Sequence, residues 1–97
     1  MTPAEMRAAF QADLARRIGM MEQLADRLEA GADCRTEVVA TLAAHLHDIK
    51  GTGRPFGVPE ATELARNFEY RLKSPGGRMA LDAAALRDLL QSLRALC

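Results

Sequence analysis

The sequence predicts an all-α protein, an antiparallel up-and-down four-helix bundle formed by residues 1–97 as a single domain. Composition is the first observation: the 97 residues include 18 Ala and 13 Leu but only three Val and two Ile, a balance that favours helices over strands. The second observation is that apolar residues recur at steps of three and four along four segments, the period of an amphipathic helix. Short connections rich in Gly, Pro and Ser separate these segments, which is typical of antiparallel neighbours in a bundle.

The first two helices are defined by their end signals. Thr2-Pro3-Ala4-Glu5 is a capping box with proline at the first helical position, and Gly31 is a suitable stop for the first helix. The second helix is expected to start at an Asp33 cap and to end near Thr52. The apolar residues that should face the core are Met6, Phe10, Leu14, Ile18, Met21, Ala25 and Leu28 in the first helix, and Val38, Val39, Leu42, Leu46 and Ile49 in the second.

The last two helices follow the clearest break in the chain, residues 52–57, which contain two Gly and one Pro. A third helix should begin at about Pro59 and end at Ser74-Pro75-Gly76-Gly77, and Asp82 can cap the fourth. Their core-facing residues should be Ala61, Leu64, Phe68 and Leu72 in the third helix, and Leu86, Leu89 or Leu90, Leu93 and Leu96 in the fourth.

Charge and cysteine content exclude several classes of function. Basic and acidic side chains number 13 each, which argues against nucleic-acid binding and against attachment to anionic membranes. The sequence has no apolar run of the ~18 residues that a membrane span needs and no basic start of a signal peptide. Cys34 and Cys97 are too few for a disulfide framework or a zinc site. We therefore expect a soluble, cytoplasmic single domain.

The most informative segment is the end of the second predicted helix. At about 100° per residue, Leu42, Leu46 and Ile49 define its buried face, so His47 should point to solvent. Lys50 and Gly51 lie three and four residues further on, beside His47 on the next turn. The result is an exposed imidazole with one cation and small residues around it.

An exposed imidazole with these neighbours is suited to accept a phosphoryl group. The attacking ring nitrogen must be accessible, and the Lys50 ammonium can stabilise charge on the phosphoryl oxygens. Gly51 leaves room for the close approach of a partner protein. Together with Ala43, Ala44 and, if the helix persists that far, Arg54, Gly51 is expected to form the partner-binding surface.

The motif His47-Asp48-Ile49-Lys50-Gly51, followed by Phe56-Gly57, resembles the H-x-x-K-G…F/L-G signature of histidine-containing phosphotransfer (HPt) domains. It is also similar to the phosphoacceptor domain of chemotaxis histidine kinases. The specific resemblance covers about residues 42–72, and in the third predicted helix it rests on Ala61, Leu64, Ala65, Phe68 and Glu69.

The resemblance implies a monomeric phosphoryl carrier of a two-component phosphorelay, without enzymatic turnover of its own. The equivalent of His47 takes a phosphoryl group from a receiver aspartyl phosphate or a histidine kinase and passes it to a response-regulator receiver. Mg²⁺ belongs to the receiver, so the carrier should need no cofactor. In the family a polar side chain of the neighbouring helix often holds the other ring nitrogen, and Arg66, Asn67 and Glu69 are the candidates here.

Two other hypotheses remain open at the level of sequence. The segment from His47 to Lys50 is also similar to the H-box of sensor-kinase dimerisation domains, although Gly51 and Thr52 stand where that motif has Thr or Asn and then Pro. Alternatively, the chain is a helical adaptor whose histidine has no phosphoryl chemistry. The second histidine, His45, is expected at the core boundary and not as a second acceptor.

Overall fold

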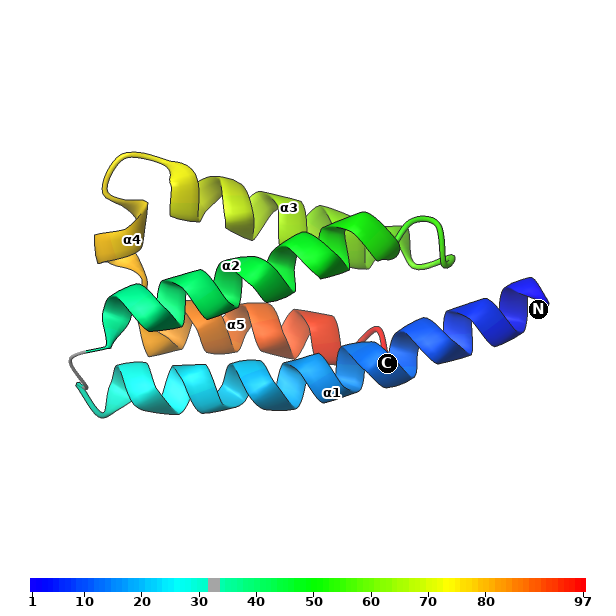
Figure 1. Ribbon diagram of the computed structural model, residues 1–97, viewed down its shortest axis with the longest axis horizontal. Coiled ribbons are helices and arrows are strands. Elements are labelled where there is room, and N and C mark those ends of the chain that lie inside the picture. Colours follow the sequence, from blue (N-terminus) through cyan, green and yellow to red (C-terminus); the bar gives the residue numbers. More distant parts are fainter. Residues whose placement is uncertain (32–33) are drawn as a thin grey trace.

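The computed structural model describes residues 1–31 and 34–97, and it confirms an all-helical fold whose four long helices pack antiparallel (Figure 1). No strand occurs among these residues. A fifth helix of four residues precedes the last long one. The elements are α1 (Pro3–Glu29), α2 (Arg35–Thr52), α3 (Pro59–Lys73), α4 (Gly77–Ala80) and α5 (Ala83–Arg94).

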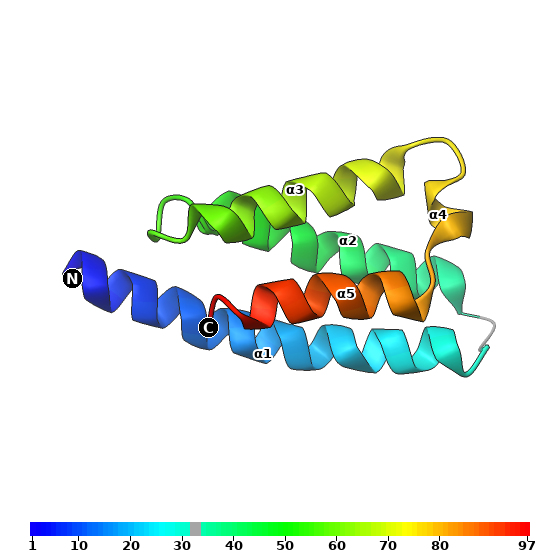
Figure 2. The ribbon, with the colours of Figure 1, turned by 180° about the vertical axis from the view of Figure 1, so that it is seen from behind.

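The helices form an elongated bundle of 44 × 24 × 19 Å. Helix α1 packs against α2 and α5, and α3 packs mainly against α2. Both ribbon views show the N-terminal turns of α1 extending beyond the rest of the bundle (Figures 1 and 2). Within the described ranges, no helix combines the length and the apolar character needed to span a membrane.

Helix ends follow the predicted end signals where the structure describes them. The Thr2 hydroxyl accepts a hydrogen bond from the Glu5 backbone N–H at 3.1 Å, and the Glu5 carboxylate accepts one from the Thr2 N–H at 3.0 Å. The Asp82 carboxylate caps α5 by accepting from the Ala85 N–H at 2.7 Å. The predicted Asp33 cap lies outside the described residues.

The predicted apolar faces form one core. Most members of these faces are less than 9% exposed, and both Leu89 and Leu90 are buried. Met6 is partly buried near the exposed start of α1, and three others are partly buried residues that pack against the core: Leu28, Leu64 and Leu96. This core fixes the rotation of α2, and therefore fixes which of its side chains face solvent.

Helix α4 is the one element that the sequence pattern did not predict. Residues 74–77 end α3 as expected, but the chain then makes one further helical turn before α5. A side chain on Gly77 would place its Cβ only 1.8 Å from the Arg71 carbonyl oxygen. The close passage of the chain over the end of α3 therefore requires glycine at this position.

Candidate functional site

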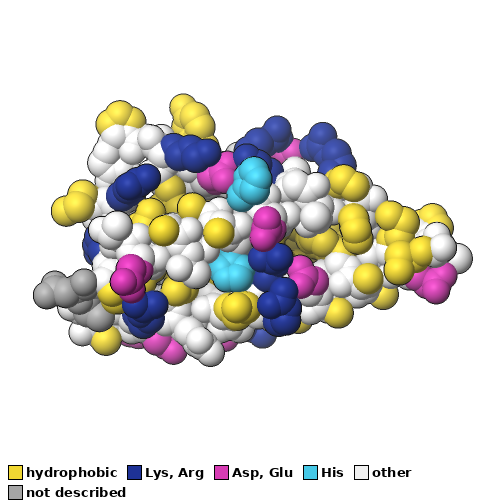
Figure 3. Space-filling view, in the orientation of Figure 1, with side chains coloured by type: hydrophobic (Ala, Val, Ile, Leu, Met, Phe, Trp, Pro, Cys, Tyr) yellow, Lys and Arg dark blue, Asp and Glu magenta, His cyan; other side chains and the backbone are white. Residues whose placement is uncertain are grey.

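His47 lies on the solvent side of α2. It is exposed, whereas Leu46 and Ile49 on the same helix are at most 1% exposed. This agrees with the orientation predicted from the helical period. The space-filling view shows both histidines of the chain on one face of the bundle, with charged side chains of both signs close by (Figure 3).

Lys50, one turn after His47, is tied to α3 by an ion pair. Its Nζ donates to Oε1 of Glu69 at 2.6 Å. The Glu69 side chain is only 8% exposed and the Lys50 side chain is 31% exposed. The hydrogen bond from Lys50 is the main reason why the pKa of the Glu69 carboxyl lies below its usual range. The lysine predicted to contact a phosphoryl group is therefore held in place by a carboxylate of the neighbouring helix.

The surface next to His47 is open. Gly51 is exposed, and a Cβ added there would meet nothing within 4 Å outside its own helix. Ala44 is exposed and Ala43 is half-buried. These three residues are small, so a partner can approach the α2 backbone closely on this face.

A threonine of α3 fixes the turn that follows α2. The Thr62 hydroxyl accepts from the Arg54 N–H at 2.8 Å and donates to the Lys50 carbonyl at 3.2 Å. A Cβ on Gly53 would lie 2.6 Å from this hydroxyl oxygen. Helix α2 ends at Thr52, so Arg54 lies in the turn and not on the His47 face of a continued helix.

The Arg54 side chain points to α3. Its Nη2 donates to Oε1 of Glu63 at 2.7 Å, and Arg66 pairs with the same carboxylate. Two arginines share one carboxylate, so this group of three side chains carries one net positive charge. The structure therefore retains a cation beside the predicted partner surface, but the turn positions it instead of the helix.

The three candidates for contact with the imidazole differ in what they face. Arg66 forms an ion pair with Glu63 on its own helix. Asn67 is exposed and borders a groove between α3 and α5, together with Asp88 and Ser92 of α5. Of the three, Glu69 is the one whose side chain hydrogen-bonds to α2, through Lys50. None of them has a hydrogen bond to His47 among the residues that the structure describes.

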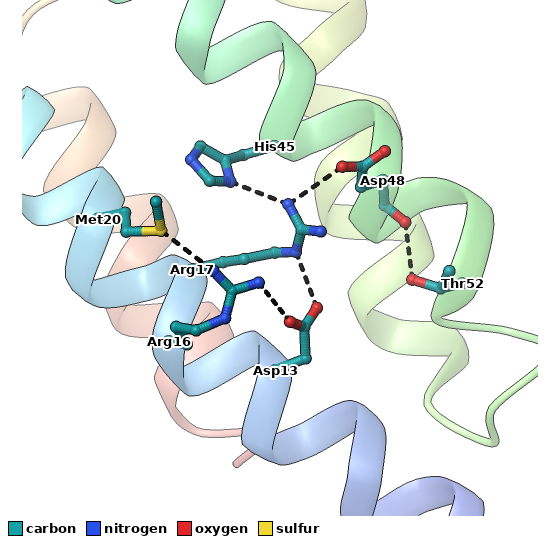
Figure 4. Close-up of polar contacts among 7 residues, drawn as sticks. All are labelled: Asp13, Arg16, Arg17, Met20, His45, Asp48 and Thr52. Atoms are coloured by element: carbon teal, nitrogen blue, oxygen red, sulfur yellow. Dashed lines mark hydrogen bonds and ion pairs between the residues drawn. The ribbon is translucent and has the colours of Figure 1, made fainter.

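A polar cluster on the other side of α2 joins this helix to α1 (Figure 4). The Arg17 side chain is 18% exposed and contacts three partners: Asp13 Oδ2 at 2.8 Å, His45 Nδ1 at 3.0 Å and Asp48 Oδ2 at 3.1 Å. Because a guanidinium only donates, the Nδ1 atom of His45 must accept, which places the ring proton on Nε2. The sequence pattern did not predict this cluster, since its partners come from two helices.

The second histidine, His45, is part of the contact between α1 and α2. His45 is 8% exposed, more buried than the boundary position expected from the helical period. Burial, followed by the charge of Arg17, lowers the pKa of the His45 imidazole. Asp48, whose side chain is 51% exposed, forms an ion pair with Arg17.

Residues 1–31 and 34–97 contain no cluster of side chains that could bind a metal ion. Nowhere in these ranges do three or more His, Cys, Asp or Glu side chains gather as they would around a metal ion. His45 and His47 point to different sides of α2, toward α1 and toward solvent respectively.

The comparisons with known proteins give one positive finding. The sequence profile of the Hpt domain family matches residues 5–96. Neither the curated proteins nor the solved structures contain a significant match to the chain. The profile extends well beyond residues 42–72, on which the motif resemblance rests, and includes the outer helices. The resemblance is thereby confirmed, and the chain belongs to the Hpt domain family.

Proposed function

We propose that His47 is the phosphoacceptor of this Hpt domain. Hpt domains carry phosphoryl groups in two-component phosphorelays. In this proposal His47 receives the group from a receiver aspartyl phosphate or from a histidine kinase, and a response-regulator receiver accepts it in turn. The observation that carries the proposal is the exposed imidazole on α2 with Lys50 one turn away and open surface at Gly51.

The transfer needs no covalent chemistry besides the exchange of one bond. The lone pair of the unprotonated His47 ring nitrogen forms the P–N bond, while the P–O bond to the donor aspartate breaks and its electron pair stays on the carboxylate. The other ring nitrogen keeps its proton during the step and can release it to water afterwards. Transfer onward to a receiver reverses these two bond changes.

Lys50 and Glu69 support this chemistry in different ways. The Lys50 ammonium stabilises the negative charge of the phosphoryl oxygens, and it is a flexible point charge that can move with the group. Glu69 is the favoured candidate for ordering the site, because its buried carboxylate reaches the turn of α2 next to His47. Arg66 and Asn67 have partners or surroundings away from α2.

The partner is proposed to dock on the small-residue surface formed by Ala43, Ala44 and Gly51, with Arg54 at its edge. Such a surface suits a receiver domain, whose acidic pocket and Mg²⁺ would supply the metal chemistry. The carrier itself is proposed to act as a monomer without a cofactor.

Phosphotransfer from a loaded receiver tests the proposal. A receiver phosphorylated by a small phosphodonor is mixed with the wild-type chain, His47→Gln and His45→Gln, and the products are analysed by intact mass and acid lability. We expect one acid-labile phosphoryl group on wild type and on His45→Gln, and none on His47→Gln. Label that survives in His47→Gln would overturn the assignment.

The two alternative hypotheses give different results. A dimerisation core of a sensor kinase would elute with the mass of a dimer, whereas the carrier should elute as a monomer. A helical adaptor would take no label from any of several receivers, while its circular dichroism spectrum would show that the helices are folded.

A further inference from the structure

The Glu69 carboxylate lies between two lysines. Its Oε1 atom is 2.6 Å from Lys50 Nζ on α2 and 3.5 Å from Lys73 Nζ, one turn further along α3. The Glu69 side chain is 8% exposed, whereas that of Lys73 is 70% exposed. One buried carboxylate therefore has an inner partner next to the acceptor histidine and an outer partner at the surface.

Phosphorylation of His47 would disturb this pair of contacts. If Lys50 turns to the phosphoryl oxygens, Glu69 loses its shorter ion pair. A buried carboxylate that loses its partner is strongly destabilised. The phosphoryl group then competes with Glu69 for the same ammonium, and this competition opposes transfer unless another cation remains on Glu69.

We propose that Lys73 is a positioning residue that keeps Glu69 paired when Lys50 turns toward the phosphoryl group on His47. The inference rests on the proposed function and adds a residue outside the H-x-x-K-G motif. Only ion partners change in this movement: both lysines keep their protons, Glu69 stays ionised, and the P–N bond is formed by His47 as described above. Lys73 is suited to the role because it is already within 4 Å of Oε1 and has a flexible side chain.

The charges around Lys73 support this assignment. Lys73 and Lys50 are the only lysines of the sequence, and both contact the same oxygen atom. Both also contribute to the lowered pKa of the Glu69 carboxyl, Lys50 more than Lys73. The unequal distances mean that Lys50 is the main partner before transfer, which leaves Lys73 available to become the main partner afterwards.

A double-mutant cycle tests whether Lys73 acts through Glu69. Initial rates of transfer from a phosphorylated receiver are measured for the wild-type chain, Lys73→Gln, Lys73→Arg, Glu69→Gln and the Glu69→Gln/Lys73→Gln double variant. We expect Lys73→Gln to slow transfer roughly two- to fivefold, the range of an exposed ion pair, because the Lys73 side chain is 70% exposed and water can partly replace its ammonium beside Glu69. Lys73→Arg should restore the rate, and Lys73→Gln should have no further effect once Glu69 is Gln.

The matched control is Arg78→Gln, which removes an exposed cation from α4 without touching Glu69. This variant should transfer at the wild-type rate. An unchanged rate in Lys73→Gln would overturn the inference and leave the proposed function intact. Equal slowing by Lys73→Gln with and without the Glu69 carboxylate, or equal slowing by Arg78→Gln, would also overturn it, because the effect would then be one of general surface charge. A wild-type chain that takes no phosphoryl group would overturn the proposed function, and this inference with it.

Discussion

Substitutions of Gly51 should affect the stability of this domain and its proposed function in different ways. The residue lies in α2 one position before its end and is exposed, and a Cβ placed on it would have no atom of another element within 4 Å. Glycine in a helix is less favourable than alanine by roughly 0.5–1 kcal/mol. Gly51→Ala should therefore raise the free energy of unfolding by about 0.5 kcal/mol, the lower end of that range because the helix ends one residue later.

A longer side chain at the same position should have a different effect on transfer. Gly51→Gln should fold as well as the wild-type chain, yet its side chain would stand between the partner and His47. Displacement of the reacting groups by about 1 Å can slow a reaction up to about a hundredfold, so we expect Gly51→Gln to slow transfer by about tenfold or more. The assay combines urea unfolding followed by circular dichroism with the initial rate of phosphoryl transfer from a receiver.

Gly19 offers a matched control on α1. It is also exposed, and a Cβ there would likewise meet nothing within 4 Å. It lies two residues after Arg17, about 200° around the helix from the side that contacts α2. Gly19→Ala and Gly19→Gln should leave transfer unchanged. A wild-type transfer rate in Gly51→Gln, or equal slowing by Gly19→Gln, would refute the reasoning that Gly51 is small for partner access.

Substitutions at three other positions should change the stability of the domain. Burial and Arg17 lower the pKa of His45, so the unfolded chain binds a proton at His45 more readily than the folded chain. The free energy of unfolding should therefore fall as the pH is lowered from about 7 to about 5. His45→Gln should reduce this pH dependence in urea titrations, and an unchanged dependence would contradict the account. Gly53→Ala should cost about 1–3 kcal/mol, because its Cβ would lie 2.6 Å from the Thr62 hydroxyl oxygen, and unchanged thermal unfolding would show that the turn adapts freely. Asp82→Ala should cost ~1 kcal/mol through the lost cap of α5, whereas Asp82→Asn should lose much less.

Much of the fold could be predicted because the relevant signals are local. The capping box at Thr2, the Asp82 cap and the apolar periodicity each depend on residues a few positions apart, and the structure confirms them. The exposure of His47 follows from the same period, because Leu46 and Ile49 must face the core. Helix α4 was not predicted, since four residues are too few to show a helical period.

The remaining features depend on how the helices pack against one another. The apolar period predicts which side of α3 faces the core, but it does not predict which helix lies beside each flank of α3. Which of Arg66, Asn67 and Glu69 faces α2 therefore depends on how the helices are arranged in the bundle. The contacts of Arg17 with α2 likewise join residues that are 28 or more positions apart. Sequence spacing on one helix cannot identify such pairs, so the ion pairs of Lys50 with Glu69 and of Arg17 with Asp48 became visible only in the folded chain.

Onward transfer from the phosphorylated domain tests the central claim most directly. The wild-type chain is loaded from one receiver, purified, and mixed with an unphosphorylated receiver and Mg²⁺, and both proteins are followed by intact mass. The account predicts that the acid-labile group leaves His47 as the receiver gains an equal amount of label. A group that stays on the chain, or that is lost only as inorganic phosphate, would contradict the conclusion that this domain is a phosphoryl carrier.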